Sequence, residues 1–295
     1  MRDFGPRPAT LKPHPPPNEH EKEIMLIAKS PVITVAPTTP IYDGIKIMCN
    51  KGFRRLPVVD PGTRKIHGMV VAMDIVDYLG GGPKYQIIEE KYSSNFYKAI
   101  YEPIRGIMTR NVVSALNTSK VSDVIKLMIE NNVGGLPIVD KNGKIWAIIT
   151  ERDIASMFAS IFSGTHVSKL MTKKVVGIDP DASIREAALT MVEHGFRRLP
   201  LVSGKELKGI VTAMDILRFF GSNEVFRHLK TGTVDSVLET KVDEISTHDI
   251  ITIKPEEDIG DATEIMKDKN VGAILVIKGK RLQGIITEKD LFKLF

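Results

Sequence analysis

Residues 51–60 read KGFRRLPVVD, and residues 194–203 read HGFRRLPLVS. Two further stretches follow the same pattern without the arginines: NNVGGLPIVD at 131–140 and KNVGAILVIK at 269–278. In each copy a methionine lies nine residues before the proline position. The pairs are Met48 and Pro57, Met128 and Pro137, Met191 and Pro200, and Met266 and Leu275. Four ungapped matches with one internal spacing indicate four copies of a single unit.

The four copies also continue in parallel downstream. They read GMVVAMDIVDYL (68–79), AIITERDIASMF (147–158), GIVTAMDILRFF (209–220) and GIITEKDLFKLF (284–295). Each contains an aspartate 15 to 17 residues after the proline position, and the length differences fall in a short segment rich in turn residues. Turn residues between two apolar runs are typical of a hairpin.

One unit therefore has a definite order of elements. An extended run comes first, and a helix follows with apolar residues at helical spacing, as in Ile41, Ile45 and Met48. The hairpin and a closing amphipathic helix complete the unit. The sequence predicts an α/β (α+β) fold made of four β-α-β-β-α repeats of about 55 residues each.

Copies 1 and 3 share Arg-Arg and Ala-Met-Asp, whereas copies 2 and 4 share Val-Gly and Thr-Glu-Arg/Lys-Asp. This alternation indicates a duplicated pair, and a unit this short buries too little apolar surface to stand alone. We expect module 1 at 24–163, with repeats 24–79 and 104–163 and a connector at 80–103. We expect module 2 at 164–295, with repeats 164–220 and 242–295 and a connector at 221–241.

Residues 1–23 differ from the rest because they hold six of the 17 prolines and almost no large apolar side chains, which predicts a flexible arm. The chain shows neither a long apolar run nor an apolar segment near its start, so we expect a cytoplasmic protein without a membrane span. The single cysteine, Cys49, fits that expectation.

Composition and motifs exclude several classes of function. The chain has 42% hydrophobic and 26% charged residues, as soluble globular proteins do. Its net charge of +5 permits an anionic partner. No phosphate-binding P-loop, zinc-protease motif or nucleophile elbow occurs, and the seven histidines show no ligand spacing. The sequence therefore predicts neither a metal site nor an enzyme.

The repeated pattern resembles the CBS domain family, whose repeats pair into Bateman modules. The match covers nearly all of residues 24–295, and four repeats without a catalytic domain are similar to the gamma-subunit family of AMP-activated protein kinase. The resemblance implies adenosine ligands in the clefts between paired repeats. It does not carry over the family's kinase partner, which nothing in this sequence indicates.

The acidic position suits such a ligand, because a carboxylate accepts hydrogen bonds from two adjacent hydroxyls such as a ribose diol. The resemblance assigns ribose binding to Asp74, Asp153, Asp215 and Asp290. Threonines three residues earlier could contact ribose or phosphate: Thr150, Thr212 and Thr287, with Val71 in copy 1. The same Thr-x-x-Asp spacing is also a capping box that needs no ligand, and both interpretations stay open.

Phosphate binding is expected at the arginine pairs Arg54, Arg55, Arg197 and Arg198, because guanidinium groups fit phosphate oxygens in bidentate fashion. Ordinary pairing with carboxylates is the alternative. Copies 2 and 4 carry Gly134, Gly135, Gly272 and Ala273 instead, which leaves room for a ligand to approach the backbone.

The remaining candidates rest on position. Arg152 and Lys289 directly precede the aspartate in copies 2 and 4, where the resemblance implies a phosphate contact and an exposed helix start is the alternative. Thr34, Ser114 and Thr252 lie near the end of the first strand, where the family often uses a hydroxyl on its ligand.

The function expected from these residues is a non-catalytic sensor of AMP, ADP or ATP that needs no cofactor and acts through a protein partner. Nucleic-acid binding is an alternative because of the pI of about 9.1, and S-adenosylmethionine or NAD are alternative ligands. The sequence leaves open whether four repeats close into one disk or two chains share it as a homodimer.

Overall fold

The computed structural model describes residues 9–10, 23–158, 164–204, 206–279 and 281–294. Repeat 1 contains α1 (Ile24–Ile27), β2 (Ile33–Thr34), α2 (Ile41–Lys51), β3 (Arg55–Val59), β4 (Ile66–Val71) and α3 (Ala72–Leu79). Repeat 2 contains β5 (Ala115–Leu116), α6 (Val121–Glu130), β6 (Gly135–Val139), β7 (Ile145–Thr150) and α7 (Glu151–Phe158).

Repeat 3 contains α8 (Val167–Leu170), α9 (Ile184–His194), β8 (Arg198–Ser203), β9 (Glu206–Thr212) and α10 (Ala213–Gly221). Repeat 4 contains β10 (Thr252–Ile253), α13 (Ile259–Asp268), β11 (Ala273–Lys278), β12 (Arg281–Thr287) and the closing 3-10 helix η4 (Asp290–Leu294). The connectors hold η1 (Pro83–Tyr85), α4 (Gln86–Tyr92), α5 (Phe96–Ile100) and η2 (Ile104–Gly106), then α11 (Val225–His228), α12 (Val234–Leu238) and η3 (Val242–Ile245).

Local sequence explains these elements. The helices α2 and α9 end on Gly52 and Gly195, both at φ 66°, where glycine adopts the left-handed conformation at little cost. In each repeat the expected hairpin forms an antiparallel pair: β3 with β4, β6 with β7, β8 with β9, and β11 with β12. The leading strands β5 and β10 add in parallel to β6 and β11.

Repeats 1 and 2 exchange the segments that precede their leading strands. Lys29 pairs with Ile148 of β7, and Thr109 pairs with Met69 of β4. Repeats 3 and 4 make the equivalent exchange: Thr172 with Ile285 and Thr247 with Ile210. The four repeats are therefore joined as 1 with 2 and 3 with 4, which confirms two Bateman modules.

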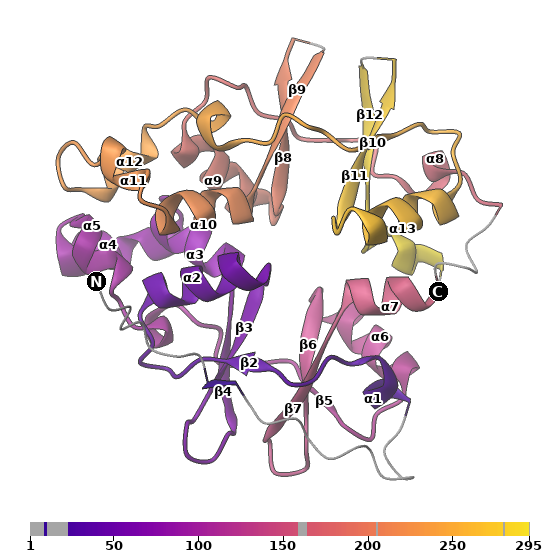
Figure 1. Ribbon diagram of the computed structural model, residues 1–295, viewed down its shortest axis with the longest axis horizontal. Helices are drawn as coiled ribbons and strands as arrows, with labels where there is room; N and C mark the ends of the chain where they lie inside the picture. The colour runs from indigo at the N-terminus through magenta and orange to yellow at the C-terminus, as the bar shows by residue number, and fades with distance from the viewer. Residues whose placement is uncertain (1–8, 11–22, 159–163, 205, 280, 295) are drawn as a thin grey trace.

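The two modules share a hydrophobic core on one side of the molecule. Helices α2 and α3 of repeat 1 pack against α10 and α9 of repeat 3, and one buried cluster contains Ile45, Leu79, Ala188 and Leu217. The connectors meet there too, because Phe96 N–H donates to the Gly232 carbonyl at 3.0 Å. Four repeats of one chain thus close into a ring (Figure 1).

Repeats 2 and 4 face each other on the opposite side, mainly through polar side chains. Their cores are separate clusters. Phe292 of repeat 4 packs in the cluster of repeat 2, and Ala155 of repeat 2 packs in the cluster of repeat 4. Arg152 bonds to the Asn270 side chain, and Lys289 bonds to the Asn132 side chain. This side of the ring therefore has less shared apolar surface than the side formed by repeats 1 and 3.

Ala9–Thr10 form strand β1, which pairs antiparallel with Ile33 and Thr34 of β2. These two residues belong to the stretch that the sequence analysis expects to be a flexible arm. The rest of that expectation concerns 1–8 and 11–22, which lie outside the described residues. Among the helices of the described residues, none has the length and apolar character that a membrane span requires.

Candidate functional site

The aspartate of every repeat lies in the first turn of the closing helix and binds the backbone just before that helix. One oxygen, Oδ2, accepts a hydrogen bond from the backbone N–H three residues earlier, at 2.8 to 2.9 Å in all four repeats. The hydroxyls of Thr150, Thr212 and Thr287 donate to the same oxygen at 2.6 to 2.7 Å. In repeats 3 and 4 the aspartate N–H donates back to the threonine hydroxyl at 3.3 Å, which completes a capping box. These contacts engage only one of the two carboxylate oxygens.

The other oxygen, Oδ1, contacts a cation in each repeat. Asp74 pairs with Lys84 at 2.5 Å, Asp153 with Lys29 at 2.9 Å, Asp215 with Arg218, and Asp290 with Lys293 at 2.6 Å. None of these four cations was predicted as a site residue from the sequence. Arg218 and Lys293 follow their aspartates by three residues, which is a readable helical signal. Lys84 and Lys29 come from the connector and the leading segment, and only the fold places them there.

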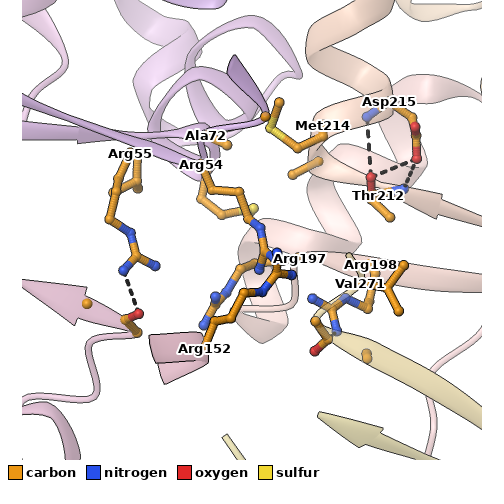
Figure 2. Close-up of a pocket in the computed structure, with 18 of the residues that line it drawn as sticks. Arg54, Arg55, Ala72, Arg152, Arg197, Arg198, Thr212, Met214, Asp215 and Val271 are labelled. Atoms are coloured by element: carbon orange, nitrogen blue, oxygen red, sulfur yellow. Dashed lines mark hydrogen bonds between the residues drawn. The ribbon is translucent and has the colours of Figure 1, made fainter. Parts of the chain in front are cut away.

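A cavity of about 600 Å³ lies at the centre of the ring, within the range typical of small-molecule sites. Asp215 and Thr212 line it, together with Arg218. Its apolar lining comes from all four repeats and includes Met73, Val133, Ile210, Met214 and Ile251. Besides Arg218, five more arginines complete the lining: Arg54, Arg55, Arg152, Arg197 and Arg198 (Figure 2).

The second arginine of each pair stays within its own module. Arg55 Nη1 donates to the Gly134 carbonyl at 2.5 Å, and Arg198 Nη1 donates to the Gly272 carbonyl at 2.8 Å. A Cβ on Gly135 would stand 1.6 Å from Arg55 Nη1. We expected the small residues of repeats 2 and 4 to leave room for a ligand, but arginine side chains occupy that room.

The first arginine of each pair reaches the other module. Arg197 Nη2 lies 3.6 Å from Glu151 Oε2 of repeat 2. The guanidinium of Arg54 lies against Gly272 of repeat 4, where a Cβ would stand 3.0 Å from Nη2. The Arg-Arg pairs of repeats 1 and 3 therefore lie against the small residues of repeats 2 and 4.

Burial and mutual repulsion act on these guanidinium groups. Burial, together with the neighbouring charges of Arg54 and Arg197, lowers the pKa of Arg198 to about 9. Burial likewise lowers the pKa of Arg55 to about 10. Both side chains stay protonated at neutral pH, so the cavity concentrates positive charge that a bound anion would stabilise.

A second cavity of about 260 Å³ adjoins the first. Asp153, Thr150 and Lys29 line it, as do the buried carboxylates Glu151 and Glu288. The two cavities have four arginines in common, which we call the shared arginines: Arg54, Arg55, Arg152 and Arg197. Neither glutamate was predicted as a site residue from the sequence, although both stand in the repeated Thr-Glu-Arg/Lys-Asp pattern.

Several predicted site residues line neither of these two cavities. Arg152 does line both, and it also binds Glu288 at 2.6 Å across the module interface. The residues outside both linings are Asp74, Asp290, Thr287, Lys289, Thr34, Ser114 and Thr252. Their roles on a ligand stay predictions. Thr34, Ser114 and Thr252 each follow a residue that does line a cavity. These cavity-lining residues are Ile33, Val113 and Ile251.

A family model for the CBS domain matches residues 22–81, 104–160, 167–222 and 242–295, which include all four repeats. The chain belongs to the CBS domain family. Among the described residues of this CBS protein, no group of three or more His, Cys, Asp or Glu side chains is placed to hold a metal ion.

The uncharacterized protein MJ1225 of Methanocaldococcus jannaschii is similar to this CBS protein over almost its whole length. The two are 39% identical over 275 residues, 92% of this chain and 98% of that protein. The crystal structure of MJ1225 matches with a TM-score of 0.88 and 38% identity, covering 92% of this chain and 99% of that one. MJ1225 is described there as a proposed archaeal homologue of γ-AMPK.

Two further relatives extend the comparison. An uncharacterized 33.4 kDa protein of Thermofilum pendens is 33% identical over 266 residues, 90% of this chain and 88% of that protein. The crystal structure of an uncharacterized conserved protein from Pyrococcus horikoshii has a TM-score of 0.58 at 20% identity, covering 91% of this chain and 97% of that one. The Pyrococcus structure shows that the fold is shared.

Proposed function

We propose that this CBS protein is a non-catalytic regulatory sensor that binds an adenine nucleotide in the larger cavity. One observation carries the proposal: Asp215, suited to a ribose, and five arginines, suited to phosphates, line the same cavity of about 600 Å³. The similarity to MJ1225, described as a proposed homologue of γ-AMPK, supports an adenine nucleotide over other anions.

The binding mode follows from the partners of each group. Asp215 Oδ2 is committed to the cap of α10, so Oδ1 is the oxygen available to a ribose diol, and Arg218 would have to share it. Arg218 is 61% exposed at its side chain, so it can move without breaking packing. The phosphates would lie toward Arg198, and the adenine would pack on apolar residues such as Ile210 and Ile251.

The same location favours a small ligand over a nucleic acid. The arginine pairs line the cavity at the centre of the ring (Figure 2). A nucleic acid needs phosphate contacts along an accessible surface, which a central cavity lined by all four repeats does not offer. S-adenosylmethionine and NAD remain alternative ligands that use the same aspartate.

A sensor also needs a conformational response. The larger cavity is lined by residues of all four repeats, including Asn132 of repeat 2 and Asn270 of repeat 4. Arg152 binds Asn270 across the less apolar side of the ring. A ligand phosphate that attracts Arg152 would weaken this contact and change how repeats 2 and 4 pack. A partner protein would recognise that change.

Calorimetry with AMP, ADP, ATP, S-adenosylmethionine and NAD tests the proposal. Asp215→Asn keeps an oxygen for the Thr212 N–H but removes the charge, so nucleotide affinity should fall about tenfold or more. Asp123→Asn is the matched control, because Asp123 holds the same capping position in α6 and lines neither cavity. Equal affinities in both variants, or no binding of any of these ligands to the wild type, would contradict the proposal.

A further inference from the structure

The smaller cavity already contains its own anions. Glu151 and Glu288 are 5% exposed, and both line this cavity but not the larger one. They occupy equivalent positions in repeats 2 and 4, directly after Thr150 and Thr287. Buried carboxylates are rare unless positive groups compensate them.

The compensating groups are the shared arginines. Arg152 Nε lies 2.6 Å from Glu288 Oε1, and Arg197 Nη2 lies 3.6 Å from Glu151 Oε2. Glu288 also raises the pKa of Arg54, against the lowering effect of burial. The two glutamates thus bind arginines where a ligand phosphate would otherwise do so.

The glycines of repeats 2 and 4 place these carboxylates. A Cβ on Gly134 would stand 2.7 Å from Glu151 Oε2, and a Cβ on Gly272 would stand 2.8 Å from Glu288 Oε2. The same two positions approach Arg197 and Arg54 within 3.0 Å. In both modules a glutamate and an arginine therefore lie next to each other beside a glycine, where no side chain occupies the space.

We propose that Glu151 and Glu288 are internal counter-anions that replace a ligand phosphate, so that the smaller cavity binds an uncharged adenosine-type nucleoside and rejects nucleotides. The inference rests on the proposed function, which assigns nucleotides to the larger cavity. Asp153 would hold the ribose of the nucleoside, since its Oδ2 caps α7 and its Oδ1 contacts only the exposed Lys29 among the described residues.

Charge and size both support this assignment. A phosphate in the smaller cavity would have to displace a glutamate from an arginine and would leave two negative groups close together in a poorly solvated place. The cavity measures about 260 Å³, below the range of roughly 300 to 1,000 Å³ typical of drug-sized ligands. A nucleoside without phosphates fits such a volume better than a nucleotide.

The test compares the wild type with Glu151→Gln/Glu288→Gln, in which amides of the same size replace the two carboxylates. Glu264→Gln, on the exposed surface of α13, is the control for loss of a surface carboxylate, and it matches the single Glu288→Gln variant in charge. Calorimetric titrations use adenosine and AMP, each alone and after saturation with the other. Thermal unfolding checks the fold, and the single Glu288→Gln variant is used if the double variant unfolds.

The wild type should bind one AMP and, in its presence, one adenosine. The double variant should bind AMP at the second site about tenfold more tightly or better, and Asp153→Asn in that background should abolish the gain. The inference is overturned if AMP fills both sites of the wild type, if adenosine finds no second site, or if the double variant resembles Glu264→Gln. A wild type that binds neither ligand contradicts the proposed function itself.

Discussion

Arg55 occupies the space that a side chain at residue 135 would need. Its Nη1 donates to the carbonyl of Gly134 and lies 1.6 Å from the Cβ position of Gly135. In module 2 the equivalent of Gly135 is Ala273, and Arg198 still reaches the Gly272 carbonyl. The two arginines are thus equivalent in role but differ in the space that surrounds them.

Gly135→Ala should therefore expel Arg55 and lower the free energy of unfolding by about 1–3 kcal/mol, as overpacking does. Denaturant unfolding measures the change. Ala273→Gly is the matched control, because it adds only backbone freedom and should cost about 0.5–1 kcal/mol. A Gly135→Ala variant as stable as the wild type would mean that the Arg55 side chain can adopt another conformation at no cost.

The contact between α3 and α9 depends on Gly80. A Cβ there would stand 2.3 Å from the Ala188 Cβ and 2.5 Å from the Val76 carbonyl oxygen. Gly80→Ala should separate the two modules at their shared core and destabilise the protein by about 1–3 kcal/mol. Thermal unfolding is the measurement. Gly62→Ala, in an exposed turn with no atom nearer than 3.5 Å, should leave the midpoint nearly unchanged.

Arg152 holds repeats 2 and 4 together through Glu288 and Asn270. Arg152→Met should leave the buried Glu288 carboxylate short of a partner and lower the free energy of unfolding by about 2 kcal/mol. Lys126→Met removes an exposed pair with Glu130 at 3.7 Å and should cost at most about 0.5 kcal/mol. Similar losses in the two variants would show that the interface pair contributes nothing specific.

Asp74 should make the stability depend on pH. Burial raises its pKa above the ordinary value of 3.8, and Lys84 opposes that shift. Lys84→Met should destabilise the protein by about 2 kcal/mol at neutral pH, because the carboxylate loses its charged partner.

A raised folded-state pKa means that the folded protein binds the proton more tightly, so stability is gained as pH falls through that pKa toward 3.8. The deficit of Lys84→Met should therefore shrink in urea titrations as the pH falls from neutral toward 3.8. The exposed Lys98→Met variant should show no such recovery. A deficit that stays constant with pH would contradict the role of Asp74.

The repeats, their internal order and their pairing could be predicted from the sequence, because a fourfold pattern repeats every local signal. Pro57 and its counterparts mark the hairpin strands, and the spacing to each aspartate sets the turn between them. The aspartates and arginine pairs could be selected for the same reason. Local chemistry therefore determined which residues belong to a candidate site.

Tertiary structure decided what those residues contact. Lys84 and Lys29 approach the aspartates from distant segments, and Arg54 and Arg197 cross to the opposite module. No local pattern encodes such contacts, because they depend on how two modules close into a ring. The sequence by itself determined four paired CBS repeats and their polar positions. Only the packing of α2, α3, α9 and α10 decided that two cavities share four arginines.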